Sequence, residues 1–209
     1  MKKQSKVGII TGDLVNSSGL TEEQKQNMQS GLAGFLEGNP DVLLPIQFYR
    51  GDSFQLMVAK EKAAAIAVFI EAITLSTTGT WARISIGIGC VSKITPNNVL
   101  QSEGEAFQLS GHQIDKMKDE NRILKIAIDS VLLQSILAAS FYLAESIILN
   151  WKPGQASVIS MVPTGKTQKD IATKLGISGA AVSKALKSGN WPAIESFLQG
   201  YEQTLRDIT

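Results

Sequence analysis

Cysteine and histidine are almost absent from this sequence. Its 209 residues include one cysteine, Cys90, and one histidine, His112. A single cysteine cannot build an internal disulfide framework, and these two residues cannot supply the four nitrogen and sulfur ligands of a zinc finger. We therefore expect a fold held together by its hydrophobic core, in a reducing cytoplasm.

The sequence also lacks an uninterrupted apolar run long enough for a signal peptide or a membrane span. The apolar run in MKKQSKVGIITGD ends at Asp13, whereas a secretory signal needs about 7–15 apolar residues. The most apolar later stretch, residues 131–149, is interrupted by Gln134 and Glu145, and a spanning helix needs about 20 mostly apolar residues. We therefore expect a buried helix there and no membrane partner.

Neither sign of charge dominates, since the chain has 20 basic and 19 acidic side chains and is 44% hydrophobic. This composition is typical of a globular protein and argues against disorder or a charged tail. The balance of charge changes along the chain. Residues 1–150 hold 13 basic and 15 acidic side chains, whereas residues 151–209 hold 7 basic and 4 acidic side chains. The last quarter is therefore the stretch that favours a polyanionic partner.

The apolar periodicity predicts an α+β domain over residues 1–128. Thr21 and Gln24 form a capping box that starts its first helix. The expected strands are 6–11, 45–49, 53–59, 81–91 and 123–128, and the expected helices are 21–36, 61–75 and 104–117. Strands separated by helices need crossovers, which favours a mixed sheet with helices on one face. Residues 129–150 then form a connector helix, and residues 151–209 form a small all-α domain.

The segment Thr167–Lys187, TQKDIATKLGISGAAVSKALK, has the pattern of a helix-turn-helix. Its first half has an apolar helical face. Gly176 follows where a helix end turns left-handed, and Ser178 is a favoured N-cap for a second helix. Two helices joined by a short turn that contains glycine form the DNA-binding motif of this name. These residues also leave open a helical hairpin that packs against another protein.

The tail resembles the helix-turn-helix of sigma-factor region four and of LuxR-type regulators. The positions that carry this resemblance are Pro153, Gln155, Gly165, Lys166, Thr167, Ile171, Ala172, Leu175, Ile177, Ser178, Val182 and Lys184. The resemblance implies that the second helix enters the major groove of double-stranded DNA, while its N-cap and flanking lysines contact phosphates. The expected DNA-binding residues are Lys166, Thr167, Ser178, Gly179, Ala180, Ser183, Lys184 and Lys187. Gly179 and Ala180 lack the long polar groups that read bases, so we expect phosphate contacts with modest direct readout, or dimeric half-sites.

Two carboxylates follow strand-like segments of the first domain. Asp13 closes the first expected strand in ITGDLVNSS, and Asp52 lies in the hairpin turn of YRGDSFQL. In an antiparallel sheet these two ends can be neighbours, and two acidic groups with phosphate oxygens are a usual way to hold Mg²⁺. Each aspartate alone has a simpler explanation, because Gly-Asp is a common turn pair.

Four segments together resemble the palm domain of class III nucleotide cyclases: GDLVNSS, RGDSFQLMV, ARISIGIGCV and GEAFQLSGHQID. The resemblance implies a ferredoxin-like palm in which Asp13, the backbone carbonyl of Leu14 and Asp52 hold Mg²⁺ or Mn²⁺. It also implies nucleotide contacts at Ser17, Ser18, Gly51 and Gly104.

The sequence departs from the cyclase pattern at several functional positions. The family's transition-state asparagine and arginine fall on Gln108 and His112, and histidine lacks the bidentate fork of arginine. The purine-reading lysine and aspartate fall on Phe48 and Gln101. We therefore do not expect an active cyclase of the usual kind, and Gln108 and His112 are the remaining catalytic candidates.

Both halves together resemble the SatD family of bacterial proteins, over ITGDLVNSS, RGDSFQ, SEGEAFQLSG and the tail from Trp151. The resemblance implies a cyclase-like domain fused to a helix-turn-helix and does not define an activity. The leading hypothesis is a cytoplasmic DNA-binding regulator whose first domain is a ligand sensor or a dimerisation unit. The second is an enzyme or binder that acts on a nucleotide with Mg²⁺ at Asp13 and Asp52, and the third is a protein-interaction module. Because residues 151–209 carry a net charge of only +3, a homodimer is the expected working form.

Overall fold

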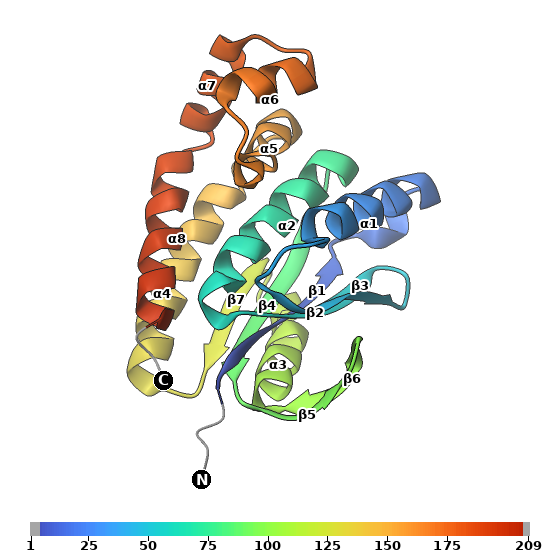
Figure 1. The fold of residues 1–209 in the computed structure, drawn as a ribbon, viewed down its shortest axis with the longest axis vertical. Coiled ribbons are helices and arrows are strands. Elements are labelled where there is room, and N and C mark those ends of the chain that lie inside the picture. The colour runs from blue at the N-terminus through green and yellow to red at the C-terminus, as the bar shows by residue number, and fades with distance from the viewer. Residues whose placement is uncertain (1–4, 207–209) are drawn as a thin grey trace.

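The fold is built around one mixed β-sheet, shown in Figure 1 as a computed structural model that describes residues 5–206. Its five strands are β1 (Val7–Leu14), β2 (Val42–Tyr49), β3 (Ser53–Val58), β4 (Ala82–Gly89) and β7 (Leu124–Ile128), in the spatial order β2-β3-β1-β4-β7. The central strand β1 is antiparallel to β3 and β4, and β4 is parallel to β7. The first four strands have the order of a ferredoxin-like βαββαβ unit, so the predicted α+β class and mixed sheet are confirmed.

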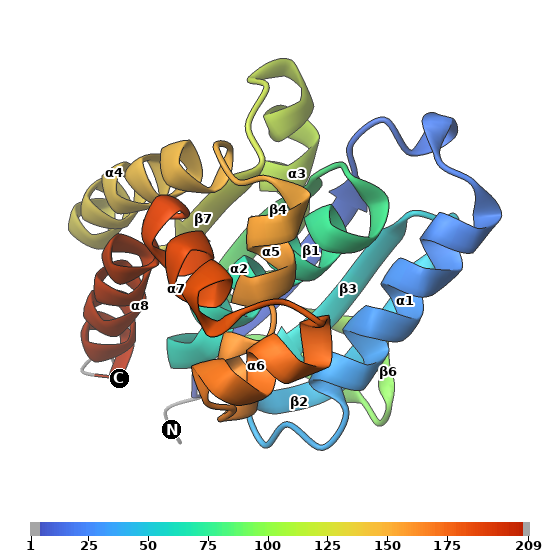
Figure 2. The same ribbon diagram turned by 90° about the horizontal axis from the view of Figure 1, so that it is seen from above.

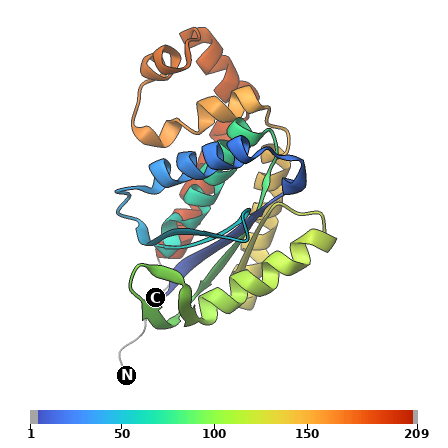
Figure 3. The same ribbon diagram turned by 90° about the vertical axis from the view of Figure 1, so that its right-hand side faces the viewer.

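Helices cover both faces of this sheet. α1 (Glu22–Leu36) and α2 (Ala63–Thr78) lie on one face, and α3 (Glu105–Asp119) lies on the other (Figure 3). Successive side chains of a strand point to opposite faces, and β1 is apolar in both directions. Ile10 joins the main core with α1 and α2, while Ile9 packs with the α3 side. The expectation of helices on one face was therefore wrong, because the first strand has no polar alternation that would leave one face in water.

The backbone of α3 approaches the sheet closely at Gly87 of β4. A Cβ atom at this position would lie 2.1 Å from the carbonyl oxygen of Ala106 and 2.6 Å from the amide nitrogen of Ser110. The hydroxyls of Thr11 and Ser110 share a buried hydrogen bond of 2.9 Å on the same side. Glycine is therefore needed at position 87 because the helix backbone occupies the space of a side chain.

A second, two-stranded sheet lies between β4 and α3 in the chain and was not predicted. β5 (Val91–Thr95) and β6 (Asn98–Gly104) pair antiparallel, and Asn97 in the turn between them is left-handed with φ 55°. The sequence Pro-Asn-Asn between two β-like segments was an overlooked turn signal. Val99 of β6 is fully buried in the cluster on the α3 side, so this hairpin helps to cover that face of the sheet.

The start of α1 follows its capping residues. The Thr21 hydroxyl accepts a hydrogen bond from the Gln24 N–H at 3.2 Å, and the Gln24 side chain accepts one from the Thr21 N–H at 3.0 Å. The predicted capping box is confirmed. Three short 3-10 helices were not predicted: η1 (Ser17–Gly19), η2 (Lys60–Lys62) and η3 (Val162–Thr164).

The long apolar helix α4 (Val131–Ile148) lies against β7. On its buried side, the Glu145 carboxylate accepts hydrogen bonds from the N–H groups of Ile123 at 2.5 Å and Leu124 at 3.1 Å, and it pairs with Arg122. Within residues 5–206, α4 is the one helix with the length and hydropathy of a membrane span. Its buried glutamate ties it to the sheet.

Four further helices form the rest of the described chain: α5 (Pro153–Ile159), α6 (Gln168–Leu175), α7 (Gly179–Ser188) and α8 (Trp191–Arg206). α8 runs beside α4 in both Figure 1 and Figure 2. The main hydrophobic core of the sheet includes Ala156 and Ile159 of α5 and Ile194 and Leu205 of α8. The expected boundaries at 128 and 150 fall at the end of β7 and just after α4, but the core continues across both.

Contacts with α2 and η2 fasten α8 to the sheet domain. The ring of Trp191 lies 5.8 Å from that of Phe69. The Tyr201 hydroxyl donates a hydrogen bond of 2.8 Å to the carbonyl of Lys60, and the Lys62 ammonium pairs with Glu202 at 2.6 Å. The last helix is therefore packed on the same helices that cover the sheet.

Candidate functional site

The first helix of the predicted helix-turn-helix is α6, at the end of the molecule farthest from β5 and β6 (Figure 1). Its N-cap is Thr167, whose hydroxyl accepts a hydrogen bond from the Asp170 N–H at 3.2 Å. The Asp170 carboxylate in turn accepts hydrogen bonds from the Thr167 hydroxyl at 2.7 Å and the Thr167 N–H at 3.0 Å. These hydrogen bonds from Thr167 hold the pKa of Asp170 below its usual range.

The turn between α6 and α7 has the predicted geometry. Gly176 ends α6 in the left-handed conformation, with φ 66° and ψ 30°, which costs glycine little because it has no Cβ. The N–H of Ile177 bonds to the carbonyl of Ala172 at 3.0 Å. The Ser178 hydroxyl then caps α7 by accepting a hydrogen bond from the Ala181 N–H at 3.1 Å.

A small hydrophobic cluster holds α5, α6 and α7 together. Its buried residues are Val158 and Met161 near the end of α5, Ile171 and Ala172 of α6, and Val182 of α7. The sequence predicts two apolar faces for the motif, made of Ile171, Ala172 and Leu175 and of Ala181, Val182 and Leu186. Ile171, Ala172 and Val182 are buried and Leu175 and Leu186 are partly buried, whereas the prediction was wrong for Ala181, which is exposed because it lies beside the packed face of α7. The two helices therefore cross with their apolar faces inward and leave the opposite face of α7 in solvent.

Every residue that the sequence assigned to DNA binding lies on this exposed surface. They are Lys166, Thr167, Ser178, Gly179, Ala180, Ser183, Lys184 and Lys187. Lys184 and Lys187 are three residues apart, so they lie on the same side of α7. The predicted residues are thus exposed on α7, on its cap and on the segment before α6.

Two exposed lysines of α6 were missed. Lys169 and Lys174 add to Lys166, Lys184 and Lys187, and within residues 5–206 none of the five has an ion-pair partner. The nearest acidic residue in the sequence, Asp170, is engaged by its cap. Lys169 and Lys174 could have been predicted from the sequence, because both are charged and lie outside the apolar face of the helix. The α6–α7 motif therefore carries more positive charge than the predicted DNA-binding residues alone would give it.

The first predicted metal ligand, Asp13, has two cationic neighbours. Its carboxylate lies 3.1 Å from the Lys118 ammonium of α3 and 3.7 Å from the Arg83 guanidinium of β4. One of its oxygens, Oδ1, is buried and accepts no hydrogen bond within the described residues. Oδ1 is also the oxygen nearest to Arg83, so a further cation could use this acceptor only in competition with the guanidinium.

The second predicted ligand, Asp52, lies on the neighbouring strand end. Its backbone carbonyl accepts a hydrogen bond from the Leu14 N–H at 3.2 Å, next to Asp13. Its carboxylate accepts a hydrogen bond from the Ser17 hydroxyl. The structure thus brings Asp13, Leu14, Ser17 and Asp52 to one end of the sheet, as predicted, but each carboxylate has its own protein partner.

A small cavity of about 70 Å³ lies beside Asp13. Its walls include Tyr49, Arg50, Asp115 and Lys118. Burial raises the pKa of the Tyr49 phenol, the Arg50 guanidinium lowers it, and three carboxylates, among them Asp13 and Asp115, raise it. The cavity is far smaller than the roughly 300–1,000 Å³ of ligand pockets. It has room for an ion or a few waters, so a nucleotide whose phosphates reach Asp13 would have to lie outside it.

The predicted nucleotide residues are not all brought together. Gly104 lies beside Val91, after the end of β4 that pairs with Val7. Val7 and Asp13 are six residues apart on β1, which is about 20 Å along a strand. Gly51 and Ser17 lie near Asp52, and Ser18 is exposed. Gly104 therefore belongs to the opposite end of the sheet.

The two catalytic candidates lie on the outside of α3. Gln108 and His112 are exposed, and neither lines the cavity beside Asp13. Phe48 packs at 6.2 Å against the buried ring of Phe54, and Gln101 is exposed on β6. The sequence could not show these positions, because they depend on where α3 and β6 lie on the sheet.

The donors at this end of the sheet fit a divalent cation in type. Asp13 and Asp52 offer carboxylate oxygens, which Mg²⁺ and Mn²⁺ prefer, and Oδ1 of Asp13 lacks a donor. Within residues 5–206 there is no group of three or more histidine, cysteine or acidic side chains arranged to hold a metal. A cation here would thus depend on the two aspartates and on oxygens from water or a ligand.

Comparison with known proteins gives one family match and a distant structural likeness. The sequence profile of the SatD family matches residues 7–199. A search of curated proteins found no match. Two structures of a bacterial light-regulated adenylyl cyclase are similar, with TM-scores of 0.43 and 0.39 and sequence identities of 14% and 12%. Each alignment covers 60% of this chain and 43% of the cyclase chain, so this chain matches less than half of the cyclase's length.

Proposed function

The chain belongs to the SatD family, and for this member we propose a DNA-binding regulator of the cytoplasm. In this proposal α7 enters the major groove of double-stranded DNA, and the sheet domain is a ligand sensor or a dimerisation unit. The observation that carries it is the capped α6–α7 unit, whose exposed surface holds five lysines without ion-pair partners. Unpaired lysines around a helix that can fit the major groove are what binding to a phosphate backbone requires.

The side chains of α7 favour contacts with phosphates over the reading of bases. At its exposed N-terminal end, Gly179 and Ala180 have no donor or acceptor beyond the backbone. Ser178, Ser183 and Lys184 remain as polar groups on this side. Since bidentate contacts from long polar side chains supply most base discrimination, we propose that this unit binds with modest sequence preference by direct contact.

A titration of duplex DNA across salt concentrations tests the proposal. The double variant Lys184→Ala/Lys187→Ala should bind more weakly, and its salt slope should fall by about 0.9 per phosphate contact removed. The variant Lys25→Ala/Lys93→Ala is a matched control, because it removes two lysines that pair with Glu22 and Glu103 away from the motif. Folded wild-type protein that binds no duplex at low salt would overturn the proposal.

A second candidate function is the binding of a divalent cation with a phosphorylated ligand at Asp13 and Asp52. The buried Oδ1 of Asp13, which accepts no hydrogen bond, favours it. Arg83, which faces Oδ1, and Lys118, which pairs with the other oxygen, would both compete with such a cation for Asp13. The Lys118 side chain is 56% exposed, so it is free to move away when the cation binds.

Calorimetry with ATP and Mn²⁺ or Mg²⁺ tests this second function. Asp13→Asn and Asp52→Asn should lose the binding heat, and Lys118→Ala should tighten binding several-fold because a competing cation is gone. Asp119→Asn, an exposed position at the end of α3, is the matched control. Binding by both aspartate variants that equals the wild type would exclude the site. A folded protein that binds neither DNA nor nucleotide and co-purifies with a partner would support the interaction-module hypothesis instead.

A further inference from the structure

The outer face of α4 is apolar and uncovered. Leu132 is 70% exposed, Ile136 53% and Leu143 66%. These three residues and Ala139, which is also exposed, recur at intervals of four, three and four residues. This is the spacing of the apolar seam by which one helix packs along another. The exposed side of α4 therefore has the pattern of a helix–helix interface without a partner helix.

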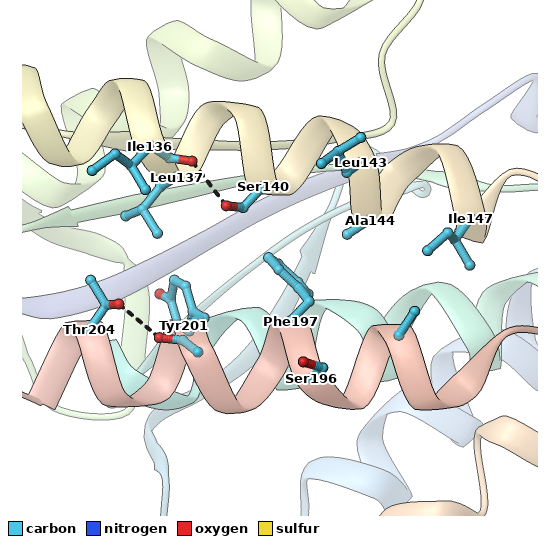
Figure 4. A pocket seen from close by; sticks show the side chains of 12 residues that line it. Ile136, Leu137, Ser140, Leu143, Ala144, Ile147, Ser196, Phe197, Tyr201 and Thr204 are labelled. Carbon is cyan, nitrogen blue, oxygen red and sulfur yellow. Dashed lines mark hydrogen bonds between the residues drawn. The ribbon is translucent and has the colours of Figure 1, made fainter.

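A groove runs beside this seam, between α4 and α8 (Figure 4). Its volume is about 530 Å³. Ile136, Leu143 and Ile147 of α4 line one wall, and small residues such as Ser196 and Gly200 of α8 line the other. Phe197 and Tyr201, which pack edge-on against Phe141, also line it. The large exposed side chains of α4 thus lie next to a groove that is wide enough to accept large apolar side chains from another molecule.

From the seam and the groove together, we infer that this face is the interface of a symmetric homodimer, in which α4 packs antiparallel against α4 of a second copy. In a twofold interface the same patch must complement itself. Here Leu132, Ile136 and Leu143 of one copy meet the seam of the other and enter its groove. The inference concerns a different surface from the DNA-binding unit and does not depend on it.

The absence of charge on this face favours a second copy over an anionic partner. Within the described residues no charged side chain lines the groove, and the single charged residue of α4, Glu145, is buried and paired with Arg122. An uncharged patch meets its own copy without repulsion. A surface for anionic lipids or nucleic acid would instead need lysine or arginine beside the apolar residues.

The size of the face also fits a dimer. α4 has 18 residues and α8 has 16, so they are about 27 Å and 24 Å long. Two adjacent helices about 10 Å wide present a face of roughly 500 Å² in projection, and its corrugated accessible surface is larger. A standard interface buries about 800 Å² from each partner, so this face alone reaches the lower part of the range for a specific dimer.

Measurement of the molar mass in solution tests the interface. Wild-type protein should have the mass of two 22.5 kDa chains at micromolar concentration, and Ile136→Glu and Leu143→Glu should each shift it to one chain. Ile94→Glu is the matched control, because Ile94 is equally exposed at 55% but lies on β5. All these positions are in solvent, so the fold should be retained, and circular dichroism verifies this.

A cross-link tests the antiparallel register. The middle of the seam falls between Ile136 and Ala139, so in the proposed dimer Ala139 of one copy meets Ile136 of the other. Facing helices with axes about 8–10 Å apart bring such residues within reach of a disulfide. Oxidised Ile136→Cys/Ala139→Cys should therefore form a covalent dimer, and Ile94→Cys should form far less of it under the same conditions.

Three outcomes would overturn the inference. The first is a wild-type monomer at all concentrations, and the second is a dimer that both glutamate variants leave intact. The third is a monomer that floats with phosphatidylcholine vesicles through the same α4 residues, which would assign the face to lipid. Each result is obtained without DNA, so failure here leaves the DNA-binding proposal to its own test.

Discussion

Glu71 of α2 is a carboxyl in the middle of the hydrophobic core. One of its oxygens accepts the Ala82 N–H at 3.1 Å, and the other is buried without a partner in the described chain. Burial raises the pKa of Glu71 well above its ordinary value, the Ala82 N–H lowers it, and the nearby Glu145 raises it. A carboxyl whose pKa is higher in the folded state stabilises the fold at low pH, and this contribution is lost as the pH rises through the folded pKa.

We predict that Glu71→Gln removes this loss. The amide has the shape of the protonated acid and does not ionise, so the variant should gain stability relative to the wild type as the pH rises from 4 to 8. Each unit of raised pKa corresponds to about 1.4 kcal/mol. Urea unfolding at a series of pH values measures it. Glu37→Gln, at an exposed position, is the control. A difference in unfolding free energy between Glu71→Gln and the wild type that does not increase with pH would contradict the prediction.

Gly87 and Gly111 should respond to alanine in opposite ways. A Cβ at Gly87 meets the backbone of α3 at 2.1 Å, so Gly87→Ala must displace the helix and should cost more than 2 kcal/mol of unfolding free energy, as overpacked cores do. Gly111 lies within α3 with nothing near its Cβ position. Gly111→Ala should stabilise by about 0.5–1 kcal/mol through helix propensity. Denaturant unfolding of both variants measures these two changes in free energy. Equal effects would show that α3 does not approach β4 as closely as described.

Single residues of the candidate metal site were predictable from the sequence, but their partners were not. Gly-Asp after a strand-like segment indicated Asp13 and Asp52 without further information. The cations beside Asp13 come from Lys118 and Arg83. These residues are 105 and 70 positions away along the chain, and they meet Asp13 only once α3 and β4 have packed on β1.

At the scale of elements, local signals located most helices. The predicted capping box at Thr21 and the left-handed Gly176 are hydrogen-bonding and backbone requirements within a few residues, so the sequence shows them directly. The capping box at Thr167 is equally local but was not predicted. The β5–β6 hairpin was missed because its strands are short and most of its outer side chains are polar. The hairpin is held against the sheet by the packing of Val99 in the cluster on the α3 side, and local periodicity does not reveal this contact.

The cap of α7 carries an element-scale prediction. Ser178→Ala removes the acceptor for the Ala181 N–H and should cost about 0.5–2 kcal/mol, whereas Ser178→Gly should cost only a few tenths. The loss should be concentrated in α7, since the other helices keep their own contacts. Hydrogen exchange of the α7 amides, followed beside global unfolding, measures it. Equal effects of alanine and glycine would mean that Ser178 does not act as a cap.

At the scale of the whole molecule, the strand order and the place of the last helix were beyond local sequence patterns. The βαββ pattern favours a mixed sheet, yet the neighbours β1 and β4 are joined by pairing between residues about 75 apart. The tail read as a separate domain because it has no strands. In the structure Trp191 and Leu205 of α8 belong to the main core, which is a property of the assembled chain.

The two proposals together predict a relation between assembly and DNA binding. A dimer places two basic units on one duplex and releases about twice as many counterions as a monomer. The salt slope of wild-type binding should therefore be about twice that of Leu143→Glu, although Leu143 is far from α7 in the sequence and on a different helix. Titrations of both proteins on the same duplex measure it, and identical slopes would show that the two surfaces act independently.

The placement of α5 and α8 in the main core has a consequence for the geometry of the DNA target. These two helices precede and follow the α6–α7 unit, and both are packed on α2. Only Gly189 and Asn190 separate α7 from α8 in the described chain, so we expect α7 to keep one orientation relative to the sheet. In a dimer joined through α4, the separation of the two copies of α7 would then be a constant of the protein. Such a protein would recognise two half-sites at one fixed spacing along the double helix. The insertion of half a helical turn between the half-sites would prevent the dimer from binding both of them at once.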